Sequence, residues 1–295
     1  MPTIMRPLGK IRAILGKWRP AIAAFRKSVW QRWKNPSGET TPVFLIGNNA
    51  SGTSMMVFQM AKSWQITLYH EDNPAAFHNW HLRDLSVIEA LLERSYAPVT
   101  LFKPILDTYL ARVLLCRFPT AKFLFAFRHF DDMINSQRNR FYDQSGRHIP
   151  AMKLHPDNPQ PPVSRWVTTD FAEFSAAPPP QKTTAFIKAR WHPGLNVDSN
   201  IALRWLFVNH LFFDLGLHRE ERVKLVHYES VVAQPEREFK SIFRFLGLEF
   251  EPHVIEGIHP FSVRRAPPPS IEPQIRADCE EMWQRLLHHF HQTNA

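Results

Sequence analysis

The stretch of sequence that decides the fold reads VFLIGNNASGTS and covers residues 43–54. Its first four residues are apolar and are followed by Gly47, which predicts a short, buried strand. From Thr53 to Trp64 the apolar residues recur at helical spacing, so the polar residues before them would lead from a strand into a helix. The spacing G-x4-G-x-S is that of a phosphate-binding loop, although Thr53 stands where a nucleotide triphosphatase has lysine.

A loop of this kind binds an anion through its backbone. The N–H groups of residues 51–54 would converge at the start of the helix, where the helix dipole also favours negative charge. The lysine that this loop lacks is the group that reaches the β- and γ-phosphates of a nucleotide, so hydrolysis of ATP or GTP is disfavoured. The competing interpretation is an ordinary polar turn, with Gly52 close to a helix cap.

Strands and helices alternate along the rest of the chain. Short apolar runs predict strands, and 3.6-residue periodicity predicts the helices between them. The expected strands are 66–69, 99–102, 122–127 and 223–227, and the expected helices are 85–94, 105–118, 131–139, 200–215, 235–246 and 275–291. This order predicts an α/β fold of three layers, a parallel sheet with helices on both faces, like that of P-loop nucleotide triphosphatases. Residues 140–199 are rich in proline and lack clean periodicity, so we expect an insertion or a lid there.

The charge of the chain is concentrated near its N-terminus. The 295 residues carry a formal net charge of +9, and residues 1–36 hold nine basic side chains and no acidic one. The remainder, with 27 basic and 27 acidic groups, is neutral, which argues against nucleic acid as a partner. The sequence has no run of about 18 apolar residues that would predict a membrane-spanning helix. Two cysteines, Cys116 and Cys279, are too few for a disulfide framework, so we expect both to be buried and the protein to be cytoplasmic.

Residues 1–38 read as a basic amphipathic arm with a linker. Apolar residues recur every three or four positions, which predicts one apolar stripe on a helix that Pro20 would kink. The stripe consists of Leu8, Ile11, Leu15, Trp18, Ile22, Phe25, Val29 and Trp33. Such a helix suits an anionic membrane surface, here the inner face of the membrane. The alternatives are packing on the protein's own domain, packing on a second subunit of a homodimer, and a targeting presequence.

A second group of polar residues follows the strand expected at 122–127. Arg128 comes directly after that strand, and Ser136 follows on the next helix. The carboxyl ends of parallel strands share one edge, where ligands bind, so Arg128 would lie near the phosphate loop. Arg128 and Ser136 would there be able to bind one phosphate together. The alternative for Arg128 is a surface ion pair with Asp132.

In combination these segments resemble the sulfotransferases that use 3′-phosphoadenosine-5′-phosphosulfate (PAPS). Further segments match that family in the same order along the chain: Phe118–Phe123, Leu225–Val231, Pro235 with Phe245–Leu248, and the late basic loop Ser262–Arg265. The resemblance spans about residues 42–290 and implies a domain of residues 39–295. It implies transfer of a sulfuryl group to a hydroxyl of a carbohydrate, a lipid or a small alcohol, without a metal. Residues 140–199 would then form the wall that binds the acceptor.

The resemblance also implies which residues bind the donor. The phosphosulfate would lie on the loop, the 3′-phosphate on Arg128 and Ser136 beneath the late basic loop, and the adenine near Tyr228. The complete donor-binding set is Asn49, Ala50, Ser51, Gly52, Thr53, Ser54, Arg128, Ser136, Tyr228, Arg264 and Arg265. Two alternatives to a sulfotransferase are a non-catalytic scaffold that binds nucleotide or membrane, and a P-loop kinase.

One departure from the family concerns the catalytic cation. The family has lysine or arginine where this chain has Ala50, and Lys103 is the candidate that would compensate. For the general base we favour Glu71, then His70, then Asp107, because the base must accept a proton from the acceptor hydroxyl. Two nearby histidines, His78 and His81, are interpreted as ordinary loop residues, since no cysteine or acidic third ligand accompanies them to form a metal site.

Overall fold

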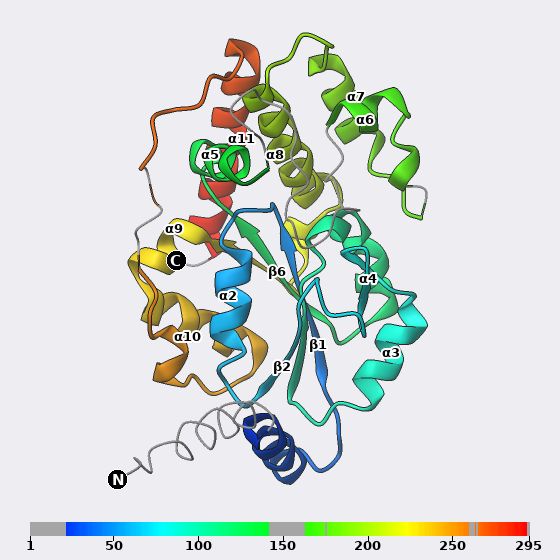
Figure 1. The fold of residues 1–295 in the computed structure, drawn as a ribbon, viewed down its shortest axis with the longest axis vertical. Helices are drawn as coiled ribbons and strands as arrows, with labels where there is room; N and C mark the ends of the chain where they lie inside the picture. The colour runs from blue at the N-terminus through cyan, green and yellow to red at the C-terminus, as the bar shows by residue number, and fades with distance from the viewer. Residues whose placement is uncertain (1–21, 142–162, 175, 260–262, 264, 294–295) are drawn as a thin grey trace, which may run out of the picture.

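A five-stranded parallel sheet forms the centre of the molecule (Figure 1). The computed structural model describes residues 22–141, 163–174, 176–259, 263 and 265–293. The strand order is β2-β5-β1-β6-β7, and every neighbouring pair is parallel. The strands are β1 (Thr41–Gly47), β2 (Ile66–Tyr69), β5 (Val99–Phe102), β6 (Lys122–Phe127) and β7 (Val223–His227). The predicted α/β class is confirmed, and the last four strands have the predicted bounds.

Helices cover both faces of the sheet because its strands are apolar on both sides. In β1, Val43 and Leu45 pack towards helices α2 and α10, whereas Phe44 and Ile46 pack towards α3, α4, α8 and α11. The helices are α2 (Thr53–Met60), α3 (Leu85–Glu93), η1 (Ile105–Leu110), α4 (Ala111–Arg117), α5 (Phe130–Phe141), α6 (Val163–Thr168), η2 (Ala172–Phe174), α7 (Gln181–Arg190), α8 (Val197–Asp214), η3 (Leu217–Arg219), α9 (Tyr228–Ala233), α10 (Pro235–Leu246), η4 (Pro252–Ile255) and α11 (Pro273–Thr293). This doubly covered sheet is the arrangement that continuous apolar strands require.

Three predicted elements differ from the structure. Helix α2 ends at Met60 rather than Trp64, and the helix expected at 105–118 is divided into η1 and α4, with Asp107 outside helical geometry. Residues 140–199, expected to be irregular, contain α6 and α7 in their described part. Their short length and proline-rich surroundings hid the helical periodicity. A small antiparallel hairpin, β3 (Phe77–His78) and β4 (His81–Leu82), and helix α9 were not predicted.

A helix at residues 22–34 packs against the end of the sheet where the strands begin (Figure 1). The described part of the predicted stripe does not pack on the domain, because Phe25 and Trp33 are 68% and 72% exposed. Packing on the protein's own domain was therefore the wrong alternative for these residues, and the predicted stripe positions before Ile22 lie outside the described residues. Among the residues that the structure describes, no helix has the length and apolar character needed to cross a membrane.

The two cysteines have different surroundings. Cys279 is buried within α11, as predicted, and its burial raises the pKa of the thiol well above the usual value. Cys116 on α4 is exposed, so the prediction that both are buried was wrong for Cys116. A seven-residue helix cannot turn every apolar residue inwards, and its buried face is already filled by Leu114 and Leu115.

Candidate functional site

The carboxyl ends of the five strands lie together at one edge of the sheet, above β1 and β6 in Figure 1. The residues that follow these strands are the loop after Gly47, His70 with Glu71, Lys103, Arg128 and Tyr228. In an open parallel sheet, ligands bind at this edge, beside the strand where the chain order reverses. Here that strand is β1, because β5 and β2 lie on one side of it and β6 and β7 on the other.

Two glycines fix the shape of the phosphate loop. A Cβ at Gly47, where φ is +123°, would lie 2.2 Å from the carbonyl oxygen of Ala126 on β6. A Cβ at Gly52, where φ is +74°, would lie 2.1 Å from Cδ2 of Tyr228. Between them Ala50 also has a positive φ of 61°, a conformation that costs free energy for any residue except glycine. The loop thus passes close to β6 and to the Tyr228 ring, as only glycine permits at its two ends.

The inner surface of the loop carries donors suited to an anion. Helix α2 has no side-chain cap, so the first N–H groups after Gly52 are open to a ligand. The Ser51 hydroxyl and the Asn49 side-chain amide are buried and have no hydrogen-bond partner among the described residues. Burying such groups without a partner is costly, and phosphate oxygens would satisfy both. These donors favour the phosphate loop over an ordinary polar turn.

Arg128 lies inside the site rather than on its surface. It is 5% exposed, and its guanidinium donates a hydrogen bond of 3.0 Å to the carbonyl oxygen of Ala50. The same group lies 4.5 Å above the Tyr228 ring and 3.7 Å from a carboxylate oxygen of Asp132. The ion pair with Asp132 therefore exists, but it is buried and accompanies the contact with the loop. Ser136 lies on helix α5, as Asp132 does, and is half-buried.

Lys103 and Glu71 form a largely buried ion pair at the ends of β5 and β2. The Lys103 Nζ atom lies 2.7 Å from Oε1 of Glu71, and the two side chains are 3% and 15% exposed. Burial lowers the pKa of Lys103, and the neighbouring carboxylate of Glu71 partly opposes this shift. The sequence predicted both residues at this edge, one as a cation and one as a base, and the structure brings them into contact.

His70 is held by Asp72 and Phe58. Its Nδ1 atom lies 2.8 Å from Asp72, and its ring stacks on Phe58 with 4.9 Å between the ring centroids. The second ring nitrogen, Nε2, is buried and has no hydrogen-bond partner among the described residues. His70 is therefore held by its neighbours in one orientation at the outer end of β2.

The hairpin β3–β4 brings His81 to Asp107, a pairing that the sequence analysis missed. Nδ1 of His81 lies 2.6 Å from Oδ1 of Asp107, and the backbone N–H of Leu82 donates to Oδ2 at 2.7 Å. The hydrogen bond to Asp107 raises the pKa of His81. The turn before His81 is formed by Asn79 and Trp80, both at positive φ. A tryptophan in that conformation is strained, and strain of this kind is concentrated at functional sites.

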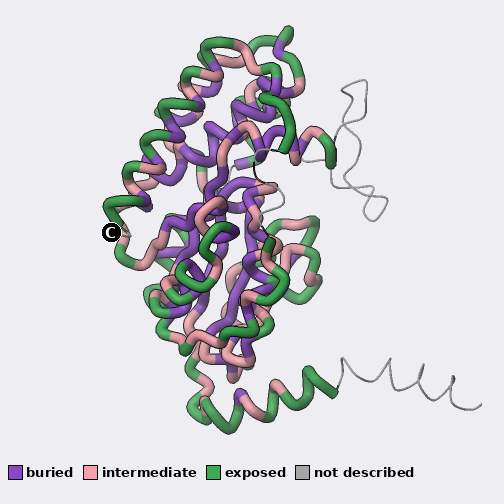
Figure 2. Tube along the Cα trace, turned by 90° about the vertical axis from the view of Figure 1, so that its left-hand side faces the viewer, coloured by how far each residue is buried: buried purple, intermediate pink, exposed green. Residues whose placement is uncertain are grey.

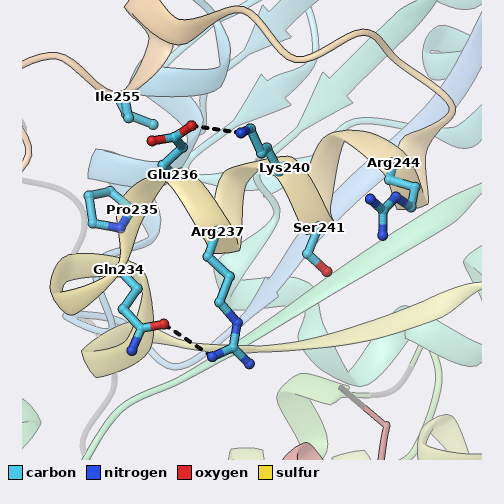
Figure 3. Close-up of a pocket in the computed structure, with 8 residues that line it drawn as sticks. All are labelled: Gln234, Pro235, Glu236, Arg237, Lys240, Ser241, Arg244 and Ile255. Atoms are coloured by element: carbon cyan, nitrogen blue, oxygen red, sulfur yellow. Dashed lines mark hydrogen bonds and ion pairs between the residues drawn. The ribbon is translucent and has the colours of Figure 1, made fainter. Parts of the chain in front are cut away.

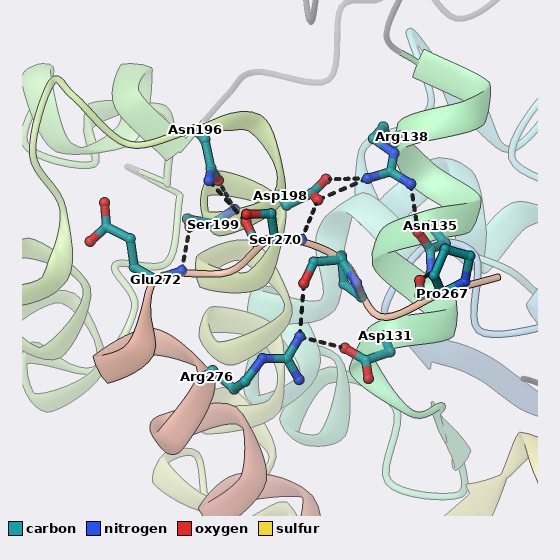
Figure 4. A network of polar contacts seen from close by, with 11 residues as sticks. Asp131, Asn135, Arg138, Asn196, Asp198, Ser199, Pro267, Ser270, Glu272 and Arg276 are labelled. Carbon is teal, nitrogen blue, oxygen red and sulfur yellow. Dashed lines mark hydrogen bonds and ion pairs between the residues drawn. The ribbon is translucent and has the colours of Figure 1, made fainter.

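The segment after Arg265 is tied to helices α5 and α8 (Figure 4). Arg138 binds both carboxylate oxygens of Asp198, which also accepts from the backbone N–H of Ser270 at 2.8 Å. Further bonds run from Asn135 to Pro267 and from Arg276 to Asp131 and Pro269. Helix α5 starts two residues after Arg128, so this network fixes residues 267–276 relative to the predicted phosphate site. Arg265 is exposed, and Arg264 lies outside the described residues.

Part of residues 140–199, the segment expected to form the acceptor wall, belongs to the core. Trp166 is 3% exposed and packs on Phe207, with 4.9 Å between the ring centroids. Trp191 is half-buried and Arg140 is exposed, whereas the side chains of residues 141 and 142 are not described. Trp166 is buried because α6 packs its apolar face on α8.

An open groove of about 850 Å³ lies elsewhere, along helix α10 (Figure 3). Its lining residues are Gln234, Pro235, Glu236, Arg237, Lys240, Ser241, Arg244 and Ile255. Lys240 is paired with Glu236 at 2.6 Å, and Arg237 donates to Gln234 at 3.1 Å. Two of the three cations that line the groove are thus engaged by neighbours on or beside helix α10. None of the predicted donor-binding residues lines this groove. Within the described residues, no group of three or more His, Cys, Asp or Glu side chains is arranged to hold a metal ion.

No family model matches the chain, and no curated protein sequence does. Solved structures similar to it in fold are sulfotransferases. The sulfotransferase domain of the Synechococcus PCC 7002 olefin synthase is 14% identical with a TM-score of 0.49, over 83% of this chain and 95% of that one. A sulfotransferase from Alicyclobacillus acidocaldarius is 12% identical with a TM-score of 0.46, over 86% and 95%. Mouse sulfotransferase SULT7A1, complexed with PAP, is 15% identical with a TM-score of 0.46, over 84% and 85%.

Proposed function

We propose that this protein transfers a sulfuryl group from PAPS to a hydroxyl acceptor. The observation that carries the proposal is the position of the Lys103–Glu71 pair, at the same sheet edge as an anion-binding loop that has no lysine of its own. A cation and a carboxylate in contact supply the two groups that the transfer needs, one for the leaving group and one for the proton. A kinase would require a lysine in the loop for its phosphates, and Thr53 stands there.

The loop residues would bind the donor. Ser51 and Asn49 would donate to phosphosulfate oxygens, together with the backbone N–H groups of Thr53 and Ser54. Arg128, with Ser136 and the basic loop at Arg265, would bind the 3′-phosphate. When bound, the donor supplies an activated sulfuryl group. Tyr228, which supports both Gly52 and Arg128, would hold the two halves of this site together rather than only contacting the adenine.

The ion pair would then act on the acceptor. Glu71 would accept the proton of the acceptor hydroxyl as the hydroxyl oxygen bonds to sulfur. Lys103 would donate a hydrogen bond to the bridging oxygen, where negative charge grows as its bond to sulfur breaks. Because Lys103 is already buried and in contact with the half-buried Glu71, little reorganisation is needed when the charge develops. The acceptor itself, whether carbohydrate, small alcohol or lipid, would enter beside α6 and α7.

Ligand-dependent thermal stability tests the donor part of the proposal. Adenosine 3′,5′-bisphosphate should raise the melting temperature by mass action, whereas ATP with magnesium should leave it unchanged. Stabilisation by ATP with magnesium alone would favour the kinase. Tight binding of the bisphosphate without turnover on any hydroxyl acceptor would favour a scaffold, a function for which Ala50 is the specific argument.

A further inference from the structure

The helix at residues 22–34 is fixed to the domain by its polar face. Lys27 Nζ donates to the carbonyl oxygens of Ala61 and Ser63 at 3.0 and 2.9 Å, and Gln31 Nε2 donates to that of Trp64 at 2.8 Å. These carbonyls belong to the turn where α2 ends, so the helix satisfies groups that the end of α2 leaves open. Lys27 and Gln31 are thus directed towards the protein, together with Trp30, whose ring packs edge-on against Trp64 with 6.0 Å between the ring centroids.

The opposite face of the same helix is apolar and exposed. Ile22, Phe25, Val29 and Trp33 follow one another at spacings of three and four residues and are 51%, 68%, 50% and 72% exposed. Their spacing puts them in one stripe along the helix. This helix lies at the lower end of the molecule in Figure 2. Few large apolar side chains are exposed elsewhere in the described chain, the others being Phe58 and Val113. Contiguous apolar surface of this kind marks an interaction site.

The charges around the stripe indicate what covers it. Arg26 lies four residues after Ile22, and Arg32 lies three after Val29, so an exposed cation stands beside the stripe on each side. Residues 1–36 hold nine basic side chains and no acidic one. A second copy of this surface would bring like charges together across a two-fold interface, which is unfavourable. Anionic lipid headgroups match both features, because they attract the cations while the acyl boundary accepts the aromatic residues.

We propose that the stripe Ile22–Phe25–Val29–Trp33 inserts into the surface of an anionic lipid bilayer. The helix would lie in the plane of the interface, with its apolar residues in the lipid and Arg26, Arg32 and Lys34 among the headgroups. Lys27 and Gln31 would keep the domain docked on the other side of the helix. Because β1 runs from this end of the molecule to the phosphate loop, the candidate site would face away from the bilayer.

Vesicle sedimentation with the full-length chain tests this proposal. The vesicles are phosphatidylcholine alone, and phosphatidylcholine with about a third of phosphatidylserine. The double variant Phe25→Ser/Trp33→Ser removes the largest part of the stripe, and Arg26→Gln removes one flanking cation. The controls are Val113→Ser, an exposed apolar residue on α4, and Arg237→Gln, an exposed cation on α10.

We expect the protein to sediment with the anionic vesicles and not with the neutral ones, and less at about 0.5 M salt than at low salt. The double variant should lose at least about tenfold in partition coefficient, and Arg26→Gln about fivefold, the scale of one cation near the surface. Both controls should bind like the wild type. Equal binding by the double variant would overturn the proposal, and so would a dimer in light scattering that the double variant converts to a monomer. Neither measurement depends on sulfuryl transfer, and bisphosphate affinity should be the same with and without vesicles.

Discussion

The Nζ atom of Lys103 lies 2.7 Å from Oε1 of Glu71, and the buried lysine and half-buried glutamate lie at the edge of the sheet that also carries the predicted phosphate loop. Removing two charges from water is costly, and a pair of this kind is often less stable than an apolar pair of equal volume. The pair lies at the same sheet edge as the loop at residues 47–54, so the proposed transfer gives a reason for the pair that stability alone does not. The pair follows from the order of the strands, because β2 and β5 are neighbours and both end here.

Substitution of either partner should abolish transfer but not donor binding. Lys103→Gln removes the cation that meets the leaving group, and Glu71→Gln removes the base, so each should lower kcat by roughly 10² to 10³. The free energy of unfolding should fall by about 3 kcal/mol in the variant that leaves Lys103 unpaired, and the double variant Lys103→Met/Glu71→Leu should recover stability without activity. Turnover assays and chemical denaturation measure both effects.

His81→Gln serves as the comparison for the base. His81 is a second side chain paired with a carboxylate near the same edge. If Glu71 accepts the proton, His81→Gln should lower kcat by less than about tenfold. A larger loss in His81→Gln than in Glu71→Gln would assign the base to the His81–Asp107 pair instead.

Arg128 should contribute to both binding and stability. Arg128→Gln should weaken the binding of adenosine 3′,5′-bisphosphate by about 1.5–3 kcal/mol, the scale of a charge-assisted hydrogen bond lost to a phosphate. It should also lower the free energy of unfolding by roughly 1–3 kcal/mol, because Ala50 loses its donor. Isothermal calorimetry and denaturation measure the two effects, with Arg237→Gln as the exposed control. Unchanged bisphosphate affinity would remove Arg128 from the site.

Much of the fold and the ends of the strands were predictable from local pattern. The runs 66–69, 99–102, 122–127 and 223–227 are short, apolar and bounded by turn residues, so their limits were found to the residue. The rule that parallel strands end at one edge then placed Lys103, Glu71 and Arg128 at the same edge of the sheet. That Lys103 touches Glu71 was not predictable, since the contact depends on β2 pairing with β5.

Two features of the molecule depend on tertiary contacts that the sequence does not show. His81 meets Asp107 through a hairpin whose strands have two residues each and whose turn places Trp80 at positive φ, against its preference. The stripe was visible, but periodicity reveals only which residues share a face. Its exposure depends on Lys27 and Gln31 turning towards α2, a tertiary contact.

The pairing of His81 with Asp107 should make stability depend on pH. The hydrogen bond raises the pKa of His81 in the folded protein, so the protonated form is favoured by folding. This stabilisation is complete below the unfolded pKa of about 6.5 and is lost as the pH rises through the higher folded value. Asp107→Asn should therefore destabilise the protein more at pH 5.5 than at pH 8.5, as chemical denaturation at the two values would measure. His81→Gln should remove that difference, and a difference that persists would contradict the assignment.

Docking of the helix at residues 22–34 should respond to pH in the opposite sense. Burial lowers the pKa of Lys27 from 10.5 to about 8. Between pH 8 and pH 10.5 the docked chain binds fewer protons than the undocked one. The free energy of docking therefore becomes more favourable as the pH rises through this range, and this advantage is lost as the pH falls back to about 8. Limited proteolysis before residue 41 should therefore be slower at pH 9.5 than at pH 7.5, after correction for the rate on a reference peptide. Lys27→Arg, charged throughout, should show no such change.

The last prediction tests whether Lys103 has taken over the task of the cation missing at position 50. Ala50 already has a Cβ at a φ of 61°, so Ala50→Lys adds no new clash at the backbone and extends an ammonium from the loop. In the wild type this second cation should change kcat by less than about threefold, because Lys103 already meets the charge of the leaving group. In the Lys103→Gln variant, Ala50→Lys should raise kcat by roughly tenfold to a hundredfold, because the new ammonium replaces the missing cation.

Such a result would be strongly non-additive, as expected of two groups that share one task. Ala50→Met is the matched control, because it lengthens the side chain without adding charge and should restore nothing. Rates of sulfuryl transfer in the wild type, the two single variants and the double variant complete the cycle. If Ala50→Lys accelerates the wild type and the Lys103→Gln variant by the same factor, the two positions act independently and Lys103 does not replace the missing cation.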